Sequence, residues 1–289
     1  MKIIHLSDLH LKPSRFATIN RKFKKIITRL NESDFDGSEL IVITGDLIES
    51  ALQHNSMESA HKLIGLLQEK FNNIMICSGN HDFGNFWGGD LKYMKPFYHI
   101  FSEFMTSNTT VPDDVAVGTK PPGSPFPIVN IFGNHLFIGL DSMEGEFEEE
   151  LKKGGSGDWN WWAEGKIGKR QRDLLEKILE ENESRDLKAV VYLHHHPYRK
   201  NLELNRLRDV DKFNPIVKDK VGLLLFGHNH YYQEFKRGED GFDEVDLALE
   251  GGSIKTKGDI KFRIIDYSED KPKTSEITIP FHWYSIFGC

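Results

Sequence analysis

Five short apolar runs recur along the chain, and each of them ends abruptly in polar residues. In the first run, Ile3, Ile4 and Leu6 precede a polar tip that contains Asp8 and His10. Alternate side chains of an extended backbone point the same way, so this carboxylate and this imidazole can reach one point. The runs occupy residues 3–6, 40–43, 74–77, 189–193 and 223–226. We predict that each run is a buried strand with polar groups at its carboxyl end.

Helical patterns separate the first three of these strands. Apolar residues recur at positions 23, 26, 27 and 30, and again at positions 60, 63, 64 and 67. This is the spacing of one face of an amphipathic helix. Alternating strands and helices predict crossover connections and a largely parallel sheet. Because ligands bind beyond the carboxyl ends of strands in such sheets, we expect the five polar tips to converge on one site.

The alternation is interrupted between residues 83 and 127 by a segment that is rich in aromatic side chains and contains a candidate helix at 91–105. An insertion that begins beside a polar tip either caps the site or forms a satellite hydrophobic cluster. We therefore predict a single domain over residues 1–289 with a cap insertion at about 83–127.

Further elements are expected after this insertion. Gly133 and Asn134 separate two apolar runs, which is typical of a β-hairpin. The acidic stretch 143–150 is expected to be solvated, and apolar spacing predicts a helix at 169–183. Alternating apolar residues after position 230, including the stretch 262–267, predict additional strands.

Composition is that of an ordinary globular protein. Of 289 residues, 38% are hydrophobic and 28% are charged, and no stretch approaches the ~18 uncharged apolar residues of a membrane span. The first strand begins almost at Met1 and there are only two cysteines, so we expect a cytoplasmic protein without a secretory signal, and no membrane partner. A net charge of −7 disfavours binding to extended nucleic acid, whereas bound cations could still serve an anionic substrate.

The polar tips supply a set of candidate metal ligands. They are Asp8, His10, Asp46, Asn80, one of His194, His195 and His196, and the pair His228 and His230. Seven ligands are too many for one transition metal, but they suit two ions that share a carboxylate. Mixed carboxylate and imidazole groups favour Mn, Fe, Zn, Co or Ni over calcium. A pair of such ions is suited to phosphoryl chemistry.

Five short motifs, taken in their order along the chain, resemble the signature of the calcineurin-like metallophosphoesterase family. They are Asp-Leu-His at 8–10, Gly-Asp at 45–46, Gly-Asn-His-Asp at 79–82, His-His-Pro at 195–197 and Gly-His-Asn-His at 227–230. The resemblance implies a four-layer α/β/β/α sandwich with two mixed sheets. Residues 137–142 and 165–179 are similar to the branch that contains cyclic-nucleotide phosphodiesterases and glycerophosphodiesterases.

The resemblance also implies a role for each metal ligand. Asp8, His10 and His230 would hold one ion, Asn80, His195 and His228 the other, and Asp46 would bridge them. His195 is selected because the family's histidine lies two residues before the proline. The run of three histidines leaves His194 and His196 open as alternatives.

Two further residues of the third tip are candidate catalytic residues. The resemblance makes His81 the group that faces the phosphate and assists the departing oxygen. Asp82 either orients His81 through a hydrogen bond or holds the backbone of its own turn.

These observations favour hydrolysis of a small phosphodiester, for example a cyclic nucleotide, by attack of a metal-bound hydroxide. The alternatives are a phosphomonoesterase, a nuclease of the same superfamily and a non-catalytic scaffold. The acidic charge disfavours the nuclease, and the intact ligand set disfavours the scaffold. The expected partner is a small phosphate-ester substrate, and a homodimer is compatible with the sequence.

Overall fold

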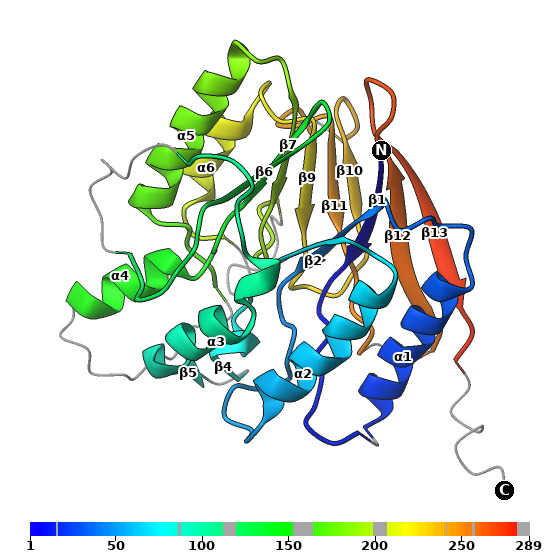
Figure 1. The fold of residues 1–289 in the computed structure, drawn as a ribbon. Helices are drawn as coiled ribbons and strands as arrows, with labels where there is room; N and C mark the ends of the chain where they lie inside the picture. The colour runs from blue at the N-terminus through cyan, green and yellow to red at the C-terminus, as the bar shows by residue number, and fades with distance from the viewer. Residues whose placement is uncertain are drawn as a thin grey trace, which may run out of the picture.

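The computed structural model describes residues 1–15, 17–85, 88–111, 120–152, 164–198, 207–240, 242–255 and 258–281. Two large mixed sheets pack against each other, and helices cover the outer face of each (Figure 1). The layer order helix, sheet, sheet, helix confirms the sandwich that the sequence predicted. Among the described residues, no helix has both the length and the apolar character needed to cross a bilayer.

The first sheet contains the first three predicted strands. Its order is β13-β12-β1-β2-β3, in which β1, β2 and β3 are parallel and the other two strands are antiparallel to their neighbours. The bounds are Lys2–Leu6 (β1), Leu40–Thr44 (β2), Asn73–Cys77 (β3), Ile260–Asp266 (β12) and Lys273–Ile279 (β13). Strand β2 is buried along its whole length, as expected for a parallel strand covered on both faces.

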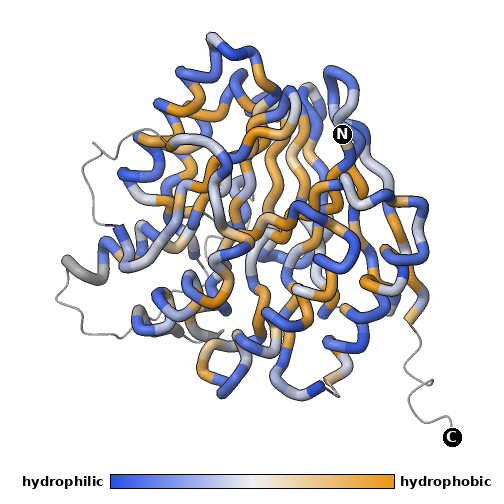
Figure 2. Tube along the Cα trace, viewed as in Figure 1, coloured by the Kyte–Doolittle hydropathy of each residue, from blue (hydrophilic) through white to orange (hydrophobic). Residues whose placement is uncertain are grey.

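Two helices cover the outer face of this sheet. They are α1 (Thr18–Asn31) and α2 (Ser56–Gly65), which continues as a short 3₁₀ helix, η1 (Leu66–Glu69). In α1, the predicted stripe of Phe23, Ile26, Ile27 and Leu30 is buried. Figure 2 shows these apolar faces turned toward the strands, with polar residues facing solvent.

The second sheet has the order β10-β11-β9-β8-β7-β6. Its bounds are Ile128–Phe132 (β6), His135–Gly139 (β7), Lys188–Tyr192 (β8), Leu223–Phe226 (β9), Glu234–Lys236 (β10) and Leu247–Glu250 (β11). Strands β6 and β7 form the predicted hairpin. Along β8, Val190 and Tyr192 join the core between the sheets, whereas Ala189 and Val191 join a second core beneath α5 (Lys169–Glu183) and α6 (Val210–Val217). The helix predicted at 169–183 is confirmed.

The aromatic insertion folds as several short elements. They are η2 (His81–Phe83), β4 (Gly84–Asn85), β5 (Gly88–Gly89), η3 (Leu91–Tyr93), α3 (Met94–Ile100) and η4 (Ser102–Phe104). The predicted helix at 91–105 is therefore divided. Phe83, Phe97 and Phe101 belong to the same buried cluster as β1, β2 and β3, so the described part of the segment is not a separate satellite cluster. Phe86 and Trp87 lie outside the described residues, and the role as a cap stays a prediction.

The expectation that the acidic stretch 143–150 is solvated is wrong. This stretch forms most of α4 (Glu144–Lys152), and Glu144 and Glu146 are buried. Arg170 Nη1 lies 2.9 Å from Glu144 Oε1, and Arg208 Nη1 lies 2.9 Å from Glu146 Oε1. These arginines are distant in sequence. Burial raises the pKa of Glu144 to about 8 and that of Glu146 to about 7, and the paired arginine opposes this rise in each case.

Candidate metal centre

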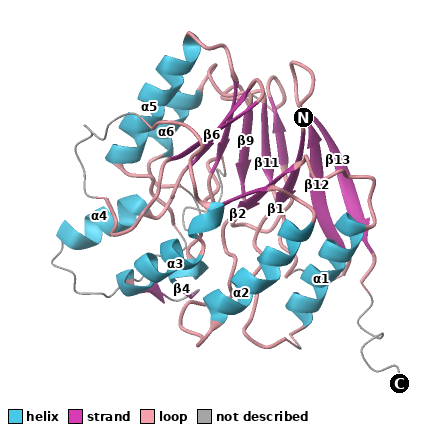
Figure 3. Ribbon diagram, viewed as in Figure 1, coloured by secondary structure: helices cyan, strands magenta, loops and turns pink. Residues whose placement is uncertain are grey.

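The five polar tips meet where β1, β2, β3, β8 and β9 run into loops at one edge of the sandwich (Figure 3). Ligand atoms of Asp8, His10 and His230 lie within 4.8 Å of one another. The same holds for Asp8, Asp46 and His194. The convergence expected from the sequence is therefore present in the fold.

The backbone bends sharply at these strand ends. In the described part of the chain, ten non-glycine residues have a positive φ, and five of them are predicted metal ligands. These are Asp8 (50°), His10 (46°), Asp46 (51°), His228 (80°) and His230 (63°). Such left-handed geometry is uncommon outside glycine, and it typically persists where function requires it. At these strand ends, the left-handed backbone directs the side chains of the predicted ligands toward one point.

Two glycines allow the loops to approach the ligands closely. A Cβ on Gly79 would lie 2.3 Å from Asp46 Oδ1, and a Cβ on Gly227 would lie 2.5 Å from Asp8 Oδ2. Both distances are far below van der Waals contact, so a larger residue would push the loops apart. The glycines in these two motifs therefore have a packing role beside the ligands.

The first ligand group joins β1 to the loop after β9. His230 Nε2 lies 3.2 Å from Asp8 Oδ1 and 3.1 Å from His10 Nε2. His10 Nε2 is also 3.7 Å from Asp46 Oδ2. Burial by itself would raise the pKa of Asp8, but the charge of His230 and its hydrogen bond hold that pKa well below the ordinary value. Burial, followed by the charge of His81, lowers the pKa of His10.

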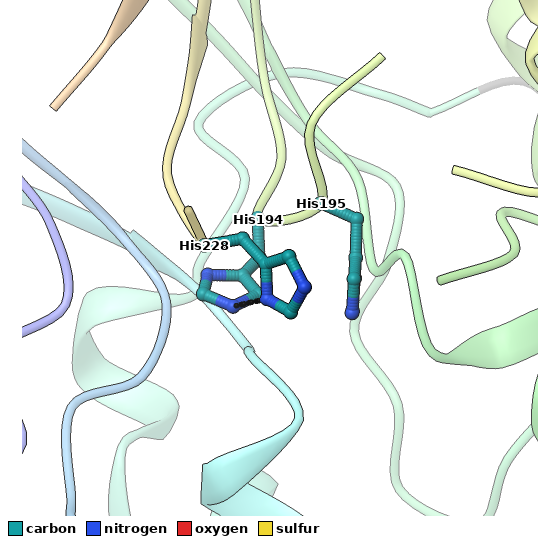
Figure 4. Close-up of side chains that lie close together, drawn as sticks. All are labelled: His194, His195 and His228. Atoms are coloured by element: carbon teal, nitrogen blue, oxygen red, sulfur yellow. Dashed lines mark hydrogen bonds between the residues drawn. The ribbon is translucent and has the colours of Figure 1, made fainter. Parts of the chain in front are cut away.

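The second ligand group is built around His194. Its Nε2 lies 3.2 Å from Asn80 Oδ1, 3.1 Å from His228 Nδ1 and 3.4 Å from Asp46 Oδ1. Figure 4 shows the rings of His194 and His228 meeting, with His195 to one side. Nδ1 of His194 donates to the carbonyl of Thr44 at 2.8 Å, so Nε2 of the neutral ring is an acceptor. Several acceptor atoms therefore face one another in this group.

The spacing and chemistry of both groups fit metal ions. Nitrogen and oxygen ligands at ~2.1 Å from one ion lie about 3 Å from their neighbours around it. The His10–His230 contact and the His194–His228 contact, both 3.1 Å, match that separation. The lowered pKa values of Asp8 and His10 favour the ionised carboxylate and the neutral imidazole that metal binding requires, whereas His230, despite its burial, has its pKa raised by Asp8 and holds a proton that a bound ion would displace. The two carboxylate oxygens of Asp46 face different groups, as a shared ligand would.

His195 also lies beside the second ligand group, since one ligand atom each of His194, His195 and His228 lie within 4.8 Å of one another. His195 and His196 differ in their other contacts. Nδ1 of His195 lies 2.7 Å from Ser142 Oγ, although its ring is also beside His228, with 4.4 Å between centroids. The ring centroid of His196 lies 4.6 Å from that of Phe226, which belongs to the second core beneath α5 and α6. Within the run of three histidines, His194 is thus the one whose ring contacts Asn80.

His81 lies beside the first ligand group. Its ring meets that of His10 edge-on at 4.7 Å, and its Nε2 is 4.0 Å from Asp46 Oδ2. Nδ1 of His81 donates to the backbone carbonyl of Glu49 at 2.7 Å, so Nε2 is the nitrogen that faces the centre. This carbonyl makes the orienting contact that the sequence suggested for Asp82.

Asp82 instead holds the backbone together. Its Oδ2 accepts from the N–H of Gly79 at 2.8 Å, and its Oδ1 accepts from the N–H of Ile48 at 3.1 Å. Burial, followed by the charge of Asp46, raises the pKa of Asp82 well above the ordinary value. Of the two alternatives raised by the sequence, these contacts match the turn-holding one.

Glu49 is a residue of the site that was not predicted from the sequence. One carboxylate oxygen, Oε2, lies 3.7 Å from Nδ1 of His10, and its carbonyl binds His81. Carboxylates behind metal-binding histidines typically fix the orientation of the ring. The available signal was the position of Glu49 only three residues after Asp46, in a strand end already assigned to the site.

Comparison with known proteins points to one family. The model of the calcineurin-like phosphoesterase family matches residues 1–232. No curated protein sequence matches the chain. The matched range contains every predicted ligand, and members of this family typically bind two divalent metals.

Solved structures of low sequence identity share the fold. A dimetal phosphatase from Danio rerio is 11% identical, with a TM-score of 0.64 over 98% of this chain and 99% of its own. GAP50, the anchor in the inner membrane complex of Plasmodium, is 13% identical, with a TM-score of 0.53 over 96% of this chain and 84% of its own. At these identities the likeness concerns the fold alone.

Proposed function

Because the chain belongs to the calcineurin-like phosphoesterase family, we propose that it is a two-metal hydrolase that acts on small phosphodiesters. The observation that carries the proposal is the pair of ligand groups at metal-binding spacing on either side of Asp46. Two bound ions would activate a water molecule and stabilise the charge that develops on the phosphoryl oxygens.

We assign the first ion to Asp8, His10 and His230, and the second to Asn80, His194 and His228, with Asp46 serving both. The choice of His194 differs from the family register, which selected His195. It is supported by the contacts of His194 Nε2 with Asn80 and Asp46. His195 also places a ligand atom within 4.8 Å of those of His194 and His228, with its Nδ1 held by Ser142, so it is the alternative ligand that the family register selects. On this assignment, Thr44 and Ser142 are positioning residues for the two histidines.

His81 is assigned to the departing oxygen. Its hydrogen bond to the Glu49 carbonyl fixes the ring so that Nε2 faces the centre. When Nε2 is protonated, it can donate that proton to the alkoxide that leaves phosphorus. Glu49 Oε2, which lies 3.7 Å from His10 Nδ1 and makes no hydrogen bond to it, would act on this ring through its charge.

The preference for a diester is supported by the segments that resemble the phosphodiesterase branch. Both segments contact His195, which lies beside the proposed ligands His194 and His228: Ser142 Oγ is 2.7 Å from its Nδ1, and a Cβ on Gly165 would lie 2.2 Å from its Cγ. Gln171, from the second segment, binds the backbone of Asp141. These residues thus support the wall of the centre formed by the end of β8.

We therefore expect bis(para-nitrophenyl) phosphate to be cleaved with a higher kcat/KM than para-nitrophenyl phosphate. The measurement is nitrophenolate release by the metal-loaded protein, with Asp46→Asn as the inactive control. A higher kcat/KM for the monoester would favour a phosphatase, and activity restricted to polynucleotides would favour a nuclease.

A further inference from the structure

A cavity of about 420 Å³ lies beside the proposed metal centre. We call it the lysine pocket. It is lined by Lys12, Ala17, Thr18, Ile19, Lys22, Glu49, Ile254 and Lys255. Three of these residues are lysines and one is a glutamate, so the lining has an excess of two positive charges in a chain whose net charge is −7. A local positive site in an acidic protein is a natural place for an anion.

The backbone that positions the metal ligands also positions the pocket. Lys12 follows Leu11, whose N–H donates to the Leu47 carbonyl at 2.9 Å and whose carbonyl accepts from the N–H of Glu49 at 3.0 Å. Lys12 and Glu49 therefore extend side by side from the strand ends that present His10 and Asp46. The lysine pocket is therefore adjacent to the proposed metal centre.

The opposite wall is joined to the centre as well. Ser253 Oγ donates to the carbonyl of Asp8 at 2.9 Å and accepts from the N–H of Lys255 at 3.0 Å. The Lys255 ammonium lies 2.9 Å from Glu49 Oε1. Glu49, the only carboxylate among the described residues of the lining, is therefore already paired.

The remaining cations face the pocket from the first helix and the loop before it. Asn20 fixes this loop by bonding both the N–H and the carbonyl of Lys12 at 3.0 and 2.7 Å. Among the described residues, the Lys12 ammonium makes no ion pair. Lys22, which is buried, donates to the Gly258 carbonyl at 3.3 Å. The N-terminus of α1 also lines the pocket, without a side-chain cap or an acidic residue in its first turn.

We propose that the lysine pocket binds a second anionic group of the substrate, a phosphate or carboxylate carried on one of the two ester arms. This inference rests on the proposed function, and it narrows the substrate to a diester with an additional negative charge. Lys12 would be a specificity-determining residue, because its ammonium is available to that charge. Its backbone, not its side chain, makes the bonds that hold the loop.

The test compares dibutyl phosphate with the symmetric diester in which both butyl chains end in a carboxylate. Symmetry removes any dependence on which arm leaves. We expect the wild-type protein to prefer the anionic diester in kcat/KM, and Lys12→Met to lower that preference about tenfold, the worth of one charge-assisted contact. Lys24→Met is the matched control, since it removes an exposed lysine of α1 that lies outside the pocket.

A binding measurement separates this inference from the proposed function. Calorimetric titration of the metal-loaded protein with propane bisphosphonate and with propylphosphonate should show tighter binding of the bisphosphonate, and Lys12→Met should reduce that advantage. An advantage that persists unchanged in Lys12→Met, or falls equally in Lys24→Met, would overturn the pocket assignment. Retention of the Lys12-dependent advantage without hydrolysis of either diester would support the pocket and overturn the proposed function.

Discussion

Asp46→Asn is expected to lower the affinity of the protein for both metal ions and to abolish most of its activity. One carboxylate oxygen faces the His194 group at 3.4 Å, and the other faces the His10 group at 3.7 Å. The amide retains one oxygen and loses the charge, so it cannot serve both groups. Because outer-shell substitutions alone typically cost about 10–100-fold, we expect a loss of metal affinity above ~100-fold. The measurement is metal content after dialysis against limiting Mn, together with kcat.

Asp82→Asn is the matched control for this substitution. Asp82 is also buried and lies near Asp46, but its oxygens accept from the backbone of Gly79 and Ile48. The Asp82→Asn variant should unfold at a lower temperature than the wild-type protein while still binding two ions. If Asp46→Asn bound metals as Asp82→Asn does, the bridging assignment would be wrong.

His81→Ala is expected to slow the cleavage of an alkyl diester by about 10²–10⁴-fold while leaving metal content unchanged. An alkoxide is a poor leaving group and needs a proton from Nε2 of His81, the nitrogen that faces the centre. Nitrophenolate leaves readily as an anion, so the loss on a nitrophenyl diester should be much smaller. Rates on the two substrates, measured at the same metal content, give the comparison.

Two other variants define the role of His81 more narrowly. His81→Gln can donate a hydrogen bond but cannot transfer a proton, so it should not restore cleavage of the alkyl diester. Restoration would indicate that His81 positions the phosphate. His61→Ala, which removes a histidine paired with Glu103 at 2.7 Å, should leave both rates unchanged.

Much of the fold followed from local patterns. The apolar runs at 40–43 and 223–226 became β2 and β9, because parallel strands that are buried on both faces have continuous apolar sequences. The convergence of the tips followed from the rule that parallel strands present their carboxyl ends at one edge. The four-layer arrangement needed the family resemblance, since strand patterns alone do not reveal how two sheets pack.

Long-range pairing and backbone bends could not be predicted. The burial of Glu144 depends on Arg170, which is 26 residues away, and an acidic stretch viewed alone indicates a solvated surface. The difference between His194 and His195 depends on how the chain turns after β8. Three consecutive histidines carry no local signal of that turn. Strand β13 was missed because, as an edge strand, it keeps several polar side chains exposed.

The central claim is that one centre holds two ions and that both are needed for phosphoester hydrolysis. The most direct measurement is titration of metal-free protein with Mn, following bound metal and diester hydrolysis in the same samples. We expect binding to saturate at about two equivalents per chain, with hydrolysis rising mainly as the second is bound. Saturation at one equivalent, or full hydrolysis by the metal-free protein, would contradict the claim.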